Sequence, residues 1–203
     1  MRTSIDMSYP FRGSWLVQNS PASRVPSHCT RALATSYAID FVPVTEDGRT
    51  APLTLGALMR PEPAEKFPGF GRPILAPADG VVVATHEGEP DHAAYRGLPS
   101  IHYALTQHRR VASGWVALAG NCVVIERSGI MIALCHLRRG SITVRPGQQV
   151  HVGEVLAGCG NSGNSTEPHV HVQAIDHPDV ARARAVPLTF DGGLPSNGEI
   201  IHV

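Results

Sequence analysis

Short apolar segments alternate with turns rich in glycine and proline along most of the chain. The runs at residues 81–83 and 123–125 consist of β-branched residues, and the chain holds 20 glycines and 17 prolines. Such runs between turns are typical of strands, in which successive side chains point to opposite faces. The pattern predicts a mainly β protein, and the length of 203 residues fits a single domain.

The same pattern predicts where the strands lie. We expect strands at residues 36–42, on both sides of the Asp79-Gly80 turn within 72–84, and at 122–126, 130–137 and 153–158. Residues 1–27 are polar and interrupted by prolines, which favours an irregular N-terminal lead-in over the surface with one strand at 14–17. Residues 186–190 are expected to form an edge strand, and residues 191–203 a C-terminal tail.

Two segments break the strand pattern, residues 44–71 and 85–117. We interpret both as insertions, the first with a short helical turn at 53–59 and the second with a short helix at 100–112. Long loops on a β scaffold often line or cover a site. The second insertion is therefore expected to influence substrate choice.

Charge and composition exclude some partners. The 17 basic residues balance the 17 acidic ones, so the chain offers no net attraction to nucleic acid or to an anionic membrane. No apolar run has the length of a membrane span, and the first residues lack the apolar core of a signal peptide. The sequence as written predicts a cytoplasmic protein, or a cell-envelope or secreted one if a signal is missing or export is non-classical. The oligomeric state stays open.

The four cysteines stand singly, without a Cys-x-x-Cys pair. This spacing does not match a structural zinc cluster. We expect buried free thiols, although an even number also permits two disulfides.

A glycine-rich polar turn leads into His169 and His171. In a strand, residues two apart project to the same side, roughly 6 to 7 Å apart. Gly158, Gly160 and Gly163 allow the backbone to approach whatever the two imidazoles face. In a chain with 11 histidines, a His-x-His pair also arises by chance. A catalytic zinc ion usually has three protein ligands, so a zinc site here needs a further ligand from elsewhere in the chain.

Asp40 and His136 stand in apolar segments. An aspartate between Ile39 and Phe41 is costly to bury unless it is paired or binds a metal, and both readings stay open. His136 ends an apolar strand, where a buried structural histidine is the alternative. His86-Glu87 does not begin the zincin helix motif His-Glu-x-x-His, because Pro90 occupies the position of its second histidine.

These residues occur within an ordered set of motifs. The motifs are His28, Tyr-Ala-Ile-Asp-Phe around Asp40, Pro-Ile-Leu-Ala-Pro-Ala-Asp-Gly-Val-Val, Cys-His-Leu, Val-Arg-Pro-Gly-Gln-Gln-Val-His-Val-Gly and Gly-Asn-Ser-Gly-Asn-Ser-Thr-Glu-Pro-His-Val-His. The set resembles the lysostaphin-type, or LytM-like, zinc metallopeptidase family of peptidoglycan endopeptidases. The resemblance covers roughly residues 28–175 without the two insertions, and we assign the domain to 28–190.

The resemblance implies a compact antiparallel β-sheet core with a groove over the metal. It implies that His28, Asp40 and His171 bind Zn²⁺, and that His136 and His169 are the catalytic histidines. One departure concerns the first two ligands: the family commonly separates them by three residues, whereas His28 and Asp40 are twelve positions apart. His86 and His92 are the alternatives to His28.

The chemistry of this set is coherent. Two histidines and one carboxylate leave zinc a position for water, whose pKa falls toward ~7, and one histidine must then take the proton of that water. Together with the resemblance, which implies the substrate, this chemistry predicts a zinc-dependent endopeptidase acting on peptidoglycan cross-links or stem peptides. Two alternatives stay open. One is a non-catalytic LytM-like module that binds a partner and regulates another cell-wall hydrolase, and the other is an intracellular peptidase that trims a peptide precursor.

Overall fold

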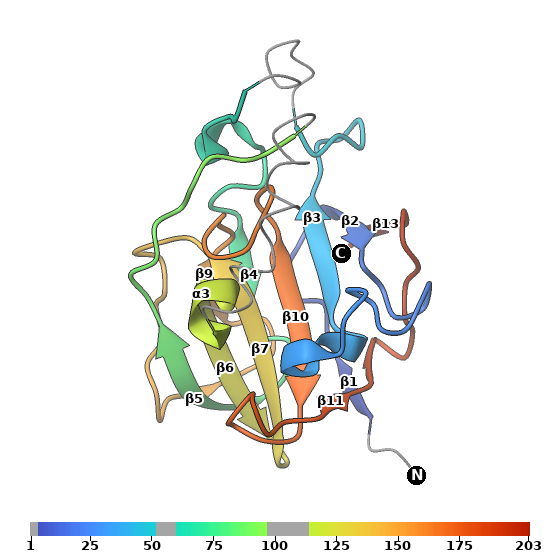
Figure 1. Cartoon of the computed structure of the whole chain (residues 1–203), viewed down its shortest axis with the longest axis vertical. Coiled ribbons are helices and arrows are strands. Elements are labelled where there is room, and N and C mark those ends of the chain that lie inside the picture. The colour runs from blue at the N-terminus through green and yellow to red at the C-terminus, as the bar shows by residue number, and fades with distance from the viewer. Residues whose placement is uncertain (1–3, 52–59, 97–113) are drawn as a thin grey trace.

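The computed structural model describes residues 4–51, 60–96 and 114–203. Within these ranges, nine strands form one sheet in which every pair is antiparallel. The strands are β2 (Ser14–Gln18), β3 (Ile39–Pro43), β5 (Gly80–His86), β6 (Asn121–Arg127), β7 (Ile130–Leu137), β8 (Gln149–Val150), β10 (Val170–Ile175), β11 (Ala185–Val186) and β13 (Ile200–His202). Their order is β13-β2-β3-β10-β7-β6-β5-β8, with β11 also paired to β10 (Figure 1). The expected mainly β, antiparallel architecture is confirmed.

Two small sheets complete the strand set of the described ranges. β1 (Ile5–Met7) runs parallel to β12 (Leu188–Phe190), and β4 (Pro73–Leu75) runs antiparallel to β9 (Val155–Gly158). The two strands expected around Asp79-Gly80 are therefore present as β4 and β5, but they pair with different partners. The turn carries the chain from one sheet to the other, and Asp79 Oδ1 accepts a hydrogen bond from the Val152 amide at 2.8 Å.

The β6–β7 hairpin closes at the turn expected from the sequence. Ser128 and Gly129 have φ angles of 52° and 81°, the left-handed conformation at both central positions that matches the twist of a two-residue hairpin. This hairpin lies next to β10 in the sheet, so it forms one wall of the region around the histidine pair.

The N-terminal segment is part of the core, which corrects the expectation of an irregular surface lead-in. Phe11 and Trp15 are fully buried, and their rings stack with centroids 4.4 Å apart. Phe11 also packs against Phe41 at 4.9 Å. The expected strand at 14–17 is present as β2, and the C-terminal tail adds β13 to its other edge. The sequence did not predict the burial of this segment, because only alternate residues of β2 face the core.

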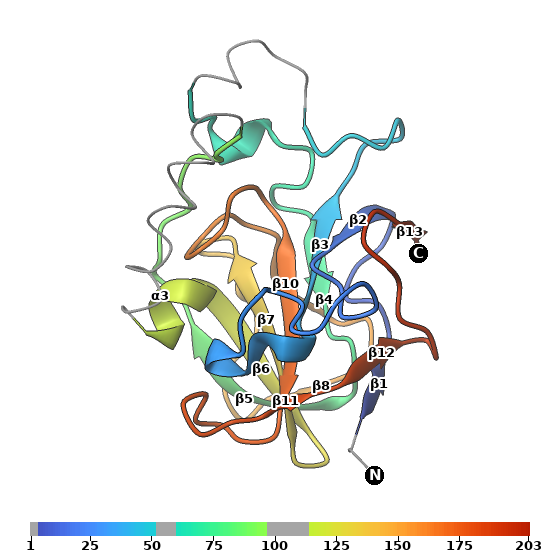
Figure 2. The same cartoon turned by 45° about the vertical axis from the view of Figure 1, so that its right-hand side comes forward.

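Three short helices accompany the sheets in the described ranges: η1 (Ala32–Tyr37), η3 (Ala64–Lys66) and α3 (Trp115–Ala119). The strand expected at 36–42 begins at Ile39, because Ser36 and Tyr37 belong to η1, which packs against β10 and β11. In both views η1, drawn in blue, lies across one face of the sheet (Figures 1 and 2). The expected helical segments at 53–59 and 100–112 lie outside the described residues.

All four cysteines are free thiols, with Cys122, Cys135 and Cys159 buried and Cys29 exposed. The expectation of free thiols holds for each, and that of burial fails at Cys29. None of the helices in the described part of the chain is long and apolar enough to cross a membrane.

Candidate metal and catalytic site

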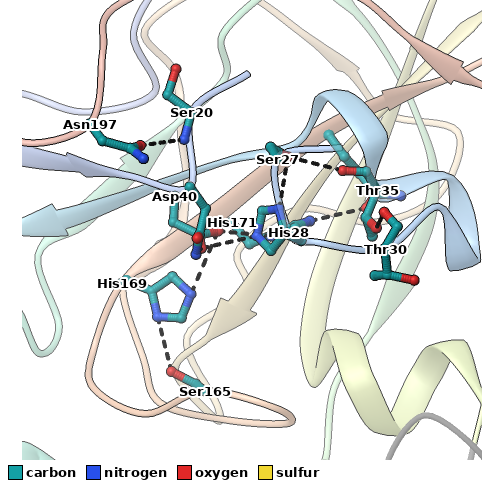
Figure 3. Close-up of polar contacts among 12 residues, drawn as sticks. Ser20, Ser27, His28, Thr30, Thr35, Asp40, Ser165, His169, His171 and Asn197 are labelled. Carbon is teal, nitrogen blue, oxygen red and sulfur yellow. Dashed lines mark hydrogen bonds and ion pairs between the residues drawn. The ribbon is translucent and has the colours of Figure 1, made fainter. Parts of the chain in front are cut away.

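The register of the central strands brings Asp40 and His171 together. Asp40 on β3 lies opposite His171 on β10, whose other neighbour is Cys135 on β7. Directly opposite residues of antiparallel strands project to the same face of the sheet. Asp40 Oδ1 accordingly lies 2.9 Å from His171 Nδ1 (Figure 3). The rigid sheet therefore positions two of the three expected zinc ligands.

His28 reaches the same point from the connection between β2 and β3. Its Nε2 atom lies 3.0 Å from Asp40 Oδ2, although 12 positions separate the two residues. The η1 helix takes up most of the intervening chain, and Leu33 and Ala34 within it adopt left-handed φ angles of 53° and 57°. The lengthened connection thus folds back on the sheet and leaves His28 beside the carboxylate.

The donor atoms of these three residues fit a zinc ion. One ligand atom from each of His28, Asp40 and His171 lies within 4.8 Å of the others. Two imidazole nitrogens and a carboxylate oxygen are a donor set that proteins use for catalytic zinc. To bind a metal, each imidazole must offer a ring nitrogen that carries no proton. A neutral imidazole has its one proton on the other nitrogen, so the hydrogen-bond partner of that other nitrogen determines whether the ring can bind.

Those opposite nitrogens have acceptors. His28 Nδ1 lies 2.9 Å from Ser27 Oγ, and because the Ser27 hydroxyl donates to the Thr35 carbonyl at 3.1 Å, its oxygen is left to accept the Nδ1 proton. His171 Nε2 lies 3.0 Å from Gln173 Oε1, an acceptor. Protons at these two positions leave His28 Nε2 and His171 Nδ1 for a metal, as second-sphere partners of metal-binding histidines commonly do.

Asp40 is buried as an anion. Burial raises its pKa, but in the metal-free protein the charge of His28 and the hydrogen bonds that His171 Nδ1 and His28 Nε2 donate hold the pKa of Asp40 well below its usual value. A metal ion would take the place of these two protons. Asn19 Nδ2 donates a further hydrogen bond to Asp40 Oδ2 at 2.7 Å. The carboxylate is therefore ionised and fixed in orientation, as a metal ligand requires.

A bulge in β7 places His136. Between the pairs Asn121–Leu137 and Val123–Leu134, β7 has one residue more than β6. His136 lies in this irregularity with φ 63°, an uncommon conformation for a residue other than glycine. Bulges re-aim side chains and are frequent beside active sites. The bulge thus provides a local reason why His136 departs from the regular alternation of the strand.

His136 is held in a defined tautomer. Its Nδ1 atom lies 2.9 Å from the Ser162 carbonyl oxygen, which can only accept, so Nδ1 carries the proton and Nε2 the lone pair. Burial lowers the pKa of His136 well below its usual value, and the charges of His169 and His171 lower it further. The neutral ring is therefore able to accept a proton at Nε2.

His169 is oriented in the same way from the other side. Its Nδ1 atom lies 2.8 Å from the Glu167 carbonyl oxygen. The same atom lies 3.0 Å from Ser165 Oγ (Figure 3). A carbonyl oxygen accepts, so Nδ1 is protonated, and Nε2 lies 3.8 Å from Asp40 Oδ1. The His136 and His169 rings lie 4.6 Å apart between centroids. Two proton carriers thus stand side by side next to the three donor atoms.

All five expected site residues line one cavity of about 260 Å³. Apolar residues form much of the remaining wall, including Leu33, Val42, Trp115 and Leu118. Low polarity around a site strengthens its electrostatic interactions. The cavity therefore combines a donor set for a metal, two proton carriers and room for a small part of a substrate.

The alternatives to His28 lie elsewhere. His92 makes contacts to the Gly163 and Ala93 carbonyl oxygens at 3.0 and 2.9 Å, and His86 Nε2 lies 3.7 Å from Glu89 Oε1. Neither belongs to the group of donor atoms found in the described ranges. Sequence reasoning missed the residues that orient the site: Asn19, Ser27, Ser165, Glu167 and Gln173. The alternation of a strand could have marked Gln173, which is two positions from His171 and therefore on the same face. No comparable spacing rule marks the other four residues.

Comparison with known proteins identifies the family of this chain. A family model described as Peptidase family M23 matches residues 66–181, more than half of the chain. The match includes His136, His169 and His171, while His28 and Asp40 precede it.

Similar solved structures include two catalytic domains. One is that of a mutant of the prophage-encoded M23 protein EnpA from Enterococcus faecalis, at 17% identity over 74% of this chain and 73% of that chain, with a TM-score of 0.43. The other is that of the antimicrobial peptidase lysostaphin from Staphylococcus simulans, at 16% identity over 73% of this chain and 74% of that chain, with a TM-score of 0.41.

Proposed function

Because the chain belongs to peptidase family M23, we propose that it is a zinc-dependent endopeptidase that hydrolyses peptide bonds in peptidoglycan cross-links or stem peptides. The observation that carries this proposal is the convergence of donor atoms from His28, Asp40 and His171 within 4.8 Å, beside two further histidines. Modules of this type that serve only as partners of another hydrolase lack ligands or catalytic histidines, whereas all five positions are filled here.

In this proposal His28, Asp40 and His171 hold the metal through Nε2, a carboxylate oxygen and Nδ1. Bound Zn²⁺ would polarise the carbonyl of the scissile bond and lower the pKa of an attacking water toward ~7. Ser27 and Gln173 keep the two imidazoles in the tautomers that coordination needs. Asn19 keeps the carboxylate from rotating.

The proton steps fall to His136 and His169. Both rings carry a proton at Nδ1, bound to fixed oxygens, and offer Nε2 as the atom that exchanges protons. One Nε2 accepts a proton from the attacking water, and the other, when protonated, donates to the carbonyl oxygen or to the leaving amine. Such transfers typically contribute 10² to 10⁴ in rate.

Paired variants test the proposal. Wild type should contain about one zinc per chain by elemental analysis and should release new amino groups from purified peptidoglycan. His171→Ala should lose zinc and activity, whereas His169→Ala should keep zinc and lose roughly 10² to 10⁴ in turnover. Equal zinc retention in both variants would show that the ligand assignment is wrong, and zinc without hydrolysis of any peptide in wild type would favour a binding module.

The cellular location decides which substrate is met. The cytoplasmic location remains a prediction, and there the same chemistry would trim a peptide precursor. Fractionation of cells that carry the tagged protein distinguishes the envelope from the cytoplasm.

A further inference from the structure

Glu167 is a half-buried acid at the edge of the proposed site. It immediately precedes Pro168 and His169, and its carbonyl oxygen accepts the His169 Nδ1 proton at 2.8 Å and the Ser165 hydroxyl at 2.8 Å. The backbone of Glu167 is therefore fixed by a proposed catalytic residue. Glu167 is also among the residues that line the cavity.

The carboxylate of Glu167 is incompletely satisfied. Its Oε2 atom is buried and has no hydrogen-bond partner among the described residues. Burial raises the pKa of Glu167, while a hydrogen bond with Thr50 and the charges of His169 and Arg96 oppose that rise. Arg96 Nε itself donates to Glu62 Oε2 at 3.0 Å. Buried acceptors without a partner are uncommon in folded proteins, so this one requires an explanation.

The charges of the cavity wall point to the missing partner. Neither arginine nor lysine is among the described residues that line the cavity, and Asp40, the other lining acid, is held by His28, His171 and Asn19. Glu167 is therefore the lining acid with an acceptor atom to spare. A carboxylate of this kind favours a positively charged donor over a neutral or anionic one.

We propose that Glu167 determines substrate specificity by binding a primary ammonium group of the peptide, placed close to the bond that is cleaved. The inference rests on the proposed peptidase function and adds a substrate class to it: peptides with a free amine near the scissile bond. An ammonium group supplies three donors and no acceptor, so it satisfies Oε2 and neutralises the carboxylate. The amine belongs either to the start of a peptide chain or to a lysine-type side chain.

Two pairs of short peptides separate these sources. The first pair is acetyl-Ala-Lys-Ala-amide and its Nε-acetyl-lysine counterpart, and the second is Ala-Ala-Ala-amide with a free or an acetylated amino end. Calorimetric titration into the zinc-loaded protein gives Kd for each, with kcat/KM wherever a peptide is cut. Wild type should bind the amine of at least one pair roughly tenfold tighter than its acetylated partner. The pair that shows the preference identifies the source.

Glu167→Gln should remove the preference without changing zinc content, because the amide keeps the shape and loses the charge. Glu65→Gln is the matched control, since it removes the same charge from an exposed residue outside the cavity lining and should retain the preference. No preference in wild type, or an undiminished one in Glu167→Gln, would overturn the proposal. A preference in binding without any hydrolysis would support the proposed ammonium site while contradicting the proposed peptidase activity.

Discussion

At the scale of single residues, each site histidine has one ring nitrogen bound to a fixed oxygen, and that bond determines which nitrogen faces the cavity. Nδ1 is bound in His28, His136 and His169, whereas Nε2 is bound in His171. Replacing a side chain that supplies one of these oxygens should therefore change the tautomer of the histidine without removing any metal-donor atom.

Gln173→Leu tests this at His171. The variant removes the Oε1 acceptor that lies 3.0 Å from Nε2, so the ring is free to place its proton on Nδ1, where it blocks coordination. We expect zinc affinity to fall about 10- to 100-fold, measured by competition with a chromogenic chelator. Gln173→Glu keeps an acceptor and should stay near wild type. Unchanged affinity in Gln173→Leu would show that the tautomer is set by other contacts.

Glu167 predicts an unusual pH dependence of stability. Its pKa is raised by burial in the folded protein, so its contribution to stability is fully present below the unfolded pKa of ~4.3 and is lost as pH rises through the folded pKa. Glu167→Gln should therefore be more stable than wild type at pH 7 to 8, by about 1 kcal/mol or roughly 2 to 4 °C in Tm. The difference should vanish toward pH 4.

Thermal melts of both proteins in chelator, from pH 4 to 8, measure this difference without a contribution from bound metal. The exposed Glu65→Gln serves again as the control and should show no such trend. A constant difference across the pH range would contradict a raised pKa at Glu167.

Residue types and their order along the chain were sufficient to nominate the five site residues. The structure adds the burial of single atoms and the backbone conformation, which the sequence does not contain. Asp40 could be singled out because a carboxylate in an apolar strand needs a partner. Glu167 could not, since an acid in a polar turn is ordinary in a sequence and becomes unusual only when its Oε2 atom is buried. The left-handed φ of His136 likewise depends on the register of two strands.

At the scale of elements, the loop before β10 must approach its neighbours very closely. An added Cβ at Gly160 would lie 2.3 Å from Arg138 N and 2.4 Å from Arg138 Cα, both backbone atoms that cannot rotate away. Gly160 also bridges to His169. Gly160→Ala should therefore destabilise the fold by roughly 1 to 3 kcal/mol and lower turnover.

Urea unfolding and peptide hydrolysis measure both effects of Gly160→Ala. The control is Gly193→Ala, where the new Cβ meets the Phe190 carbonyl oxygen at 3.7 Å, an ordinary contact. Equal urea midpoints of unfolding for the two variants would mean that the loop before β10 accommodates the added Cβ with little loss of stability.

The second insertion is attached to this loop where the structure describes it. Asp91 accepts the Asn161 amide at 2.7 Å, and the Tyr95 amide donates to the Thr166 carbonyl at 2.7 Å. We expect that replacing residues 97–113 by a short glycine-serine linker, with residues 85–96 retained, leaves zinc content unchanged but alters which peptides are cut. Digestion of a peptide library by both proteins, read by mass spectrometry, tests this. Identical cleavage profiles would exclude a role in specificity.

Local sequence patterns predicted the positions of the strands better than they predicted which strands pair with each other. The β6–β7 hairpin was predictable because its turn and both strands are contiguous in the sequence. The partners of β4 and β5 were not, since β9 and β6 are distant and no local pattern selects between them. The burial of β2 was missed for the same reason: its place between β3 and β13 joins segments from opposite ends of the chain.

At the scale of the whole molecule, the proposed zinc site joins distant parts of the chain. Asp40 and His171 are 131 positions apart and meet only because β3 pairs with β10. In the metal-free protein this point holds a buried carboxylate among three imidazoles, with His28, His169 and His171 near it. Metal binding, which requires the folded arrangement, should therefore stabilise the entire domain.

Asp40→Asn tests this coupling between metal and fold. In wild type, a chelator should lower Tm by roughly 5 to 10 °C, because a ligand at about 100 times its Kd contributes about 2.7 kcal/mol to a domain of this size. Asp40→Asn replaces the anionic oxygen by a neutral amide, so it should take up little zinc and its Tm should barely respond to the chelator. If Asp40 instead serves a structural role, the variant loses stability yet still binds zinc and still responds. Elemental analysis and melts with and without chelator, for both proteins, distinguish these outcomes, and a full chelator response in Asp40→Asn would remove Asp40 from the proposed ligand set.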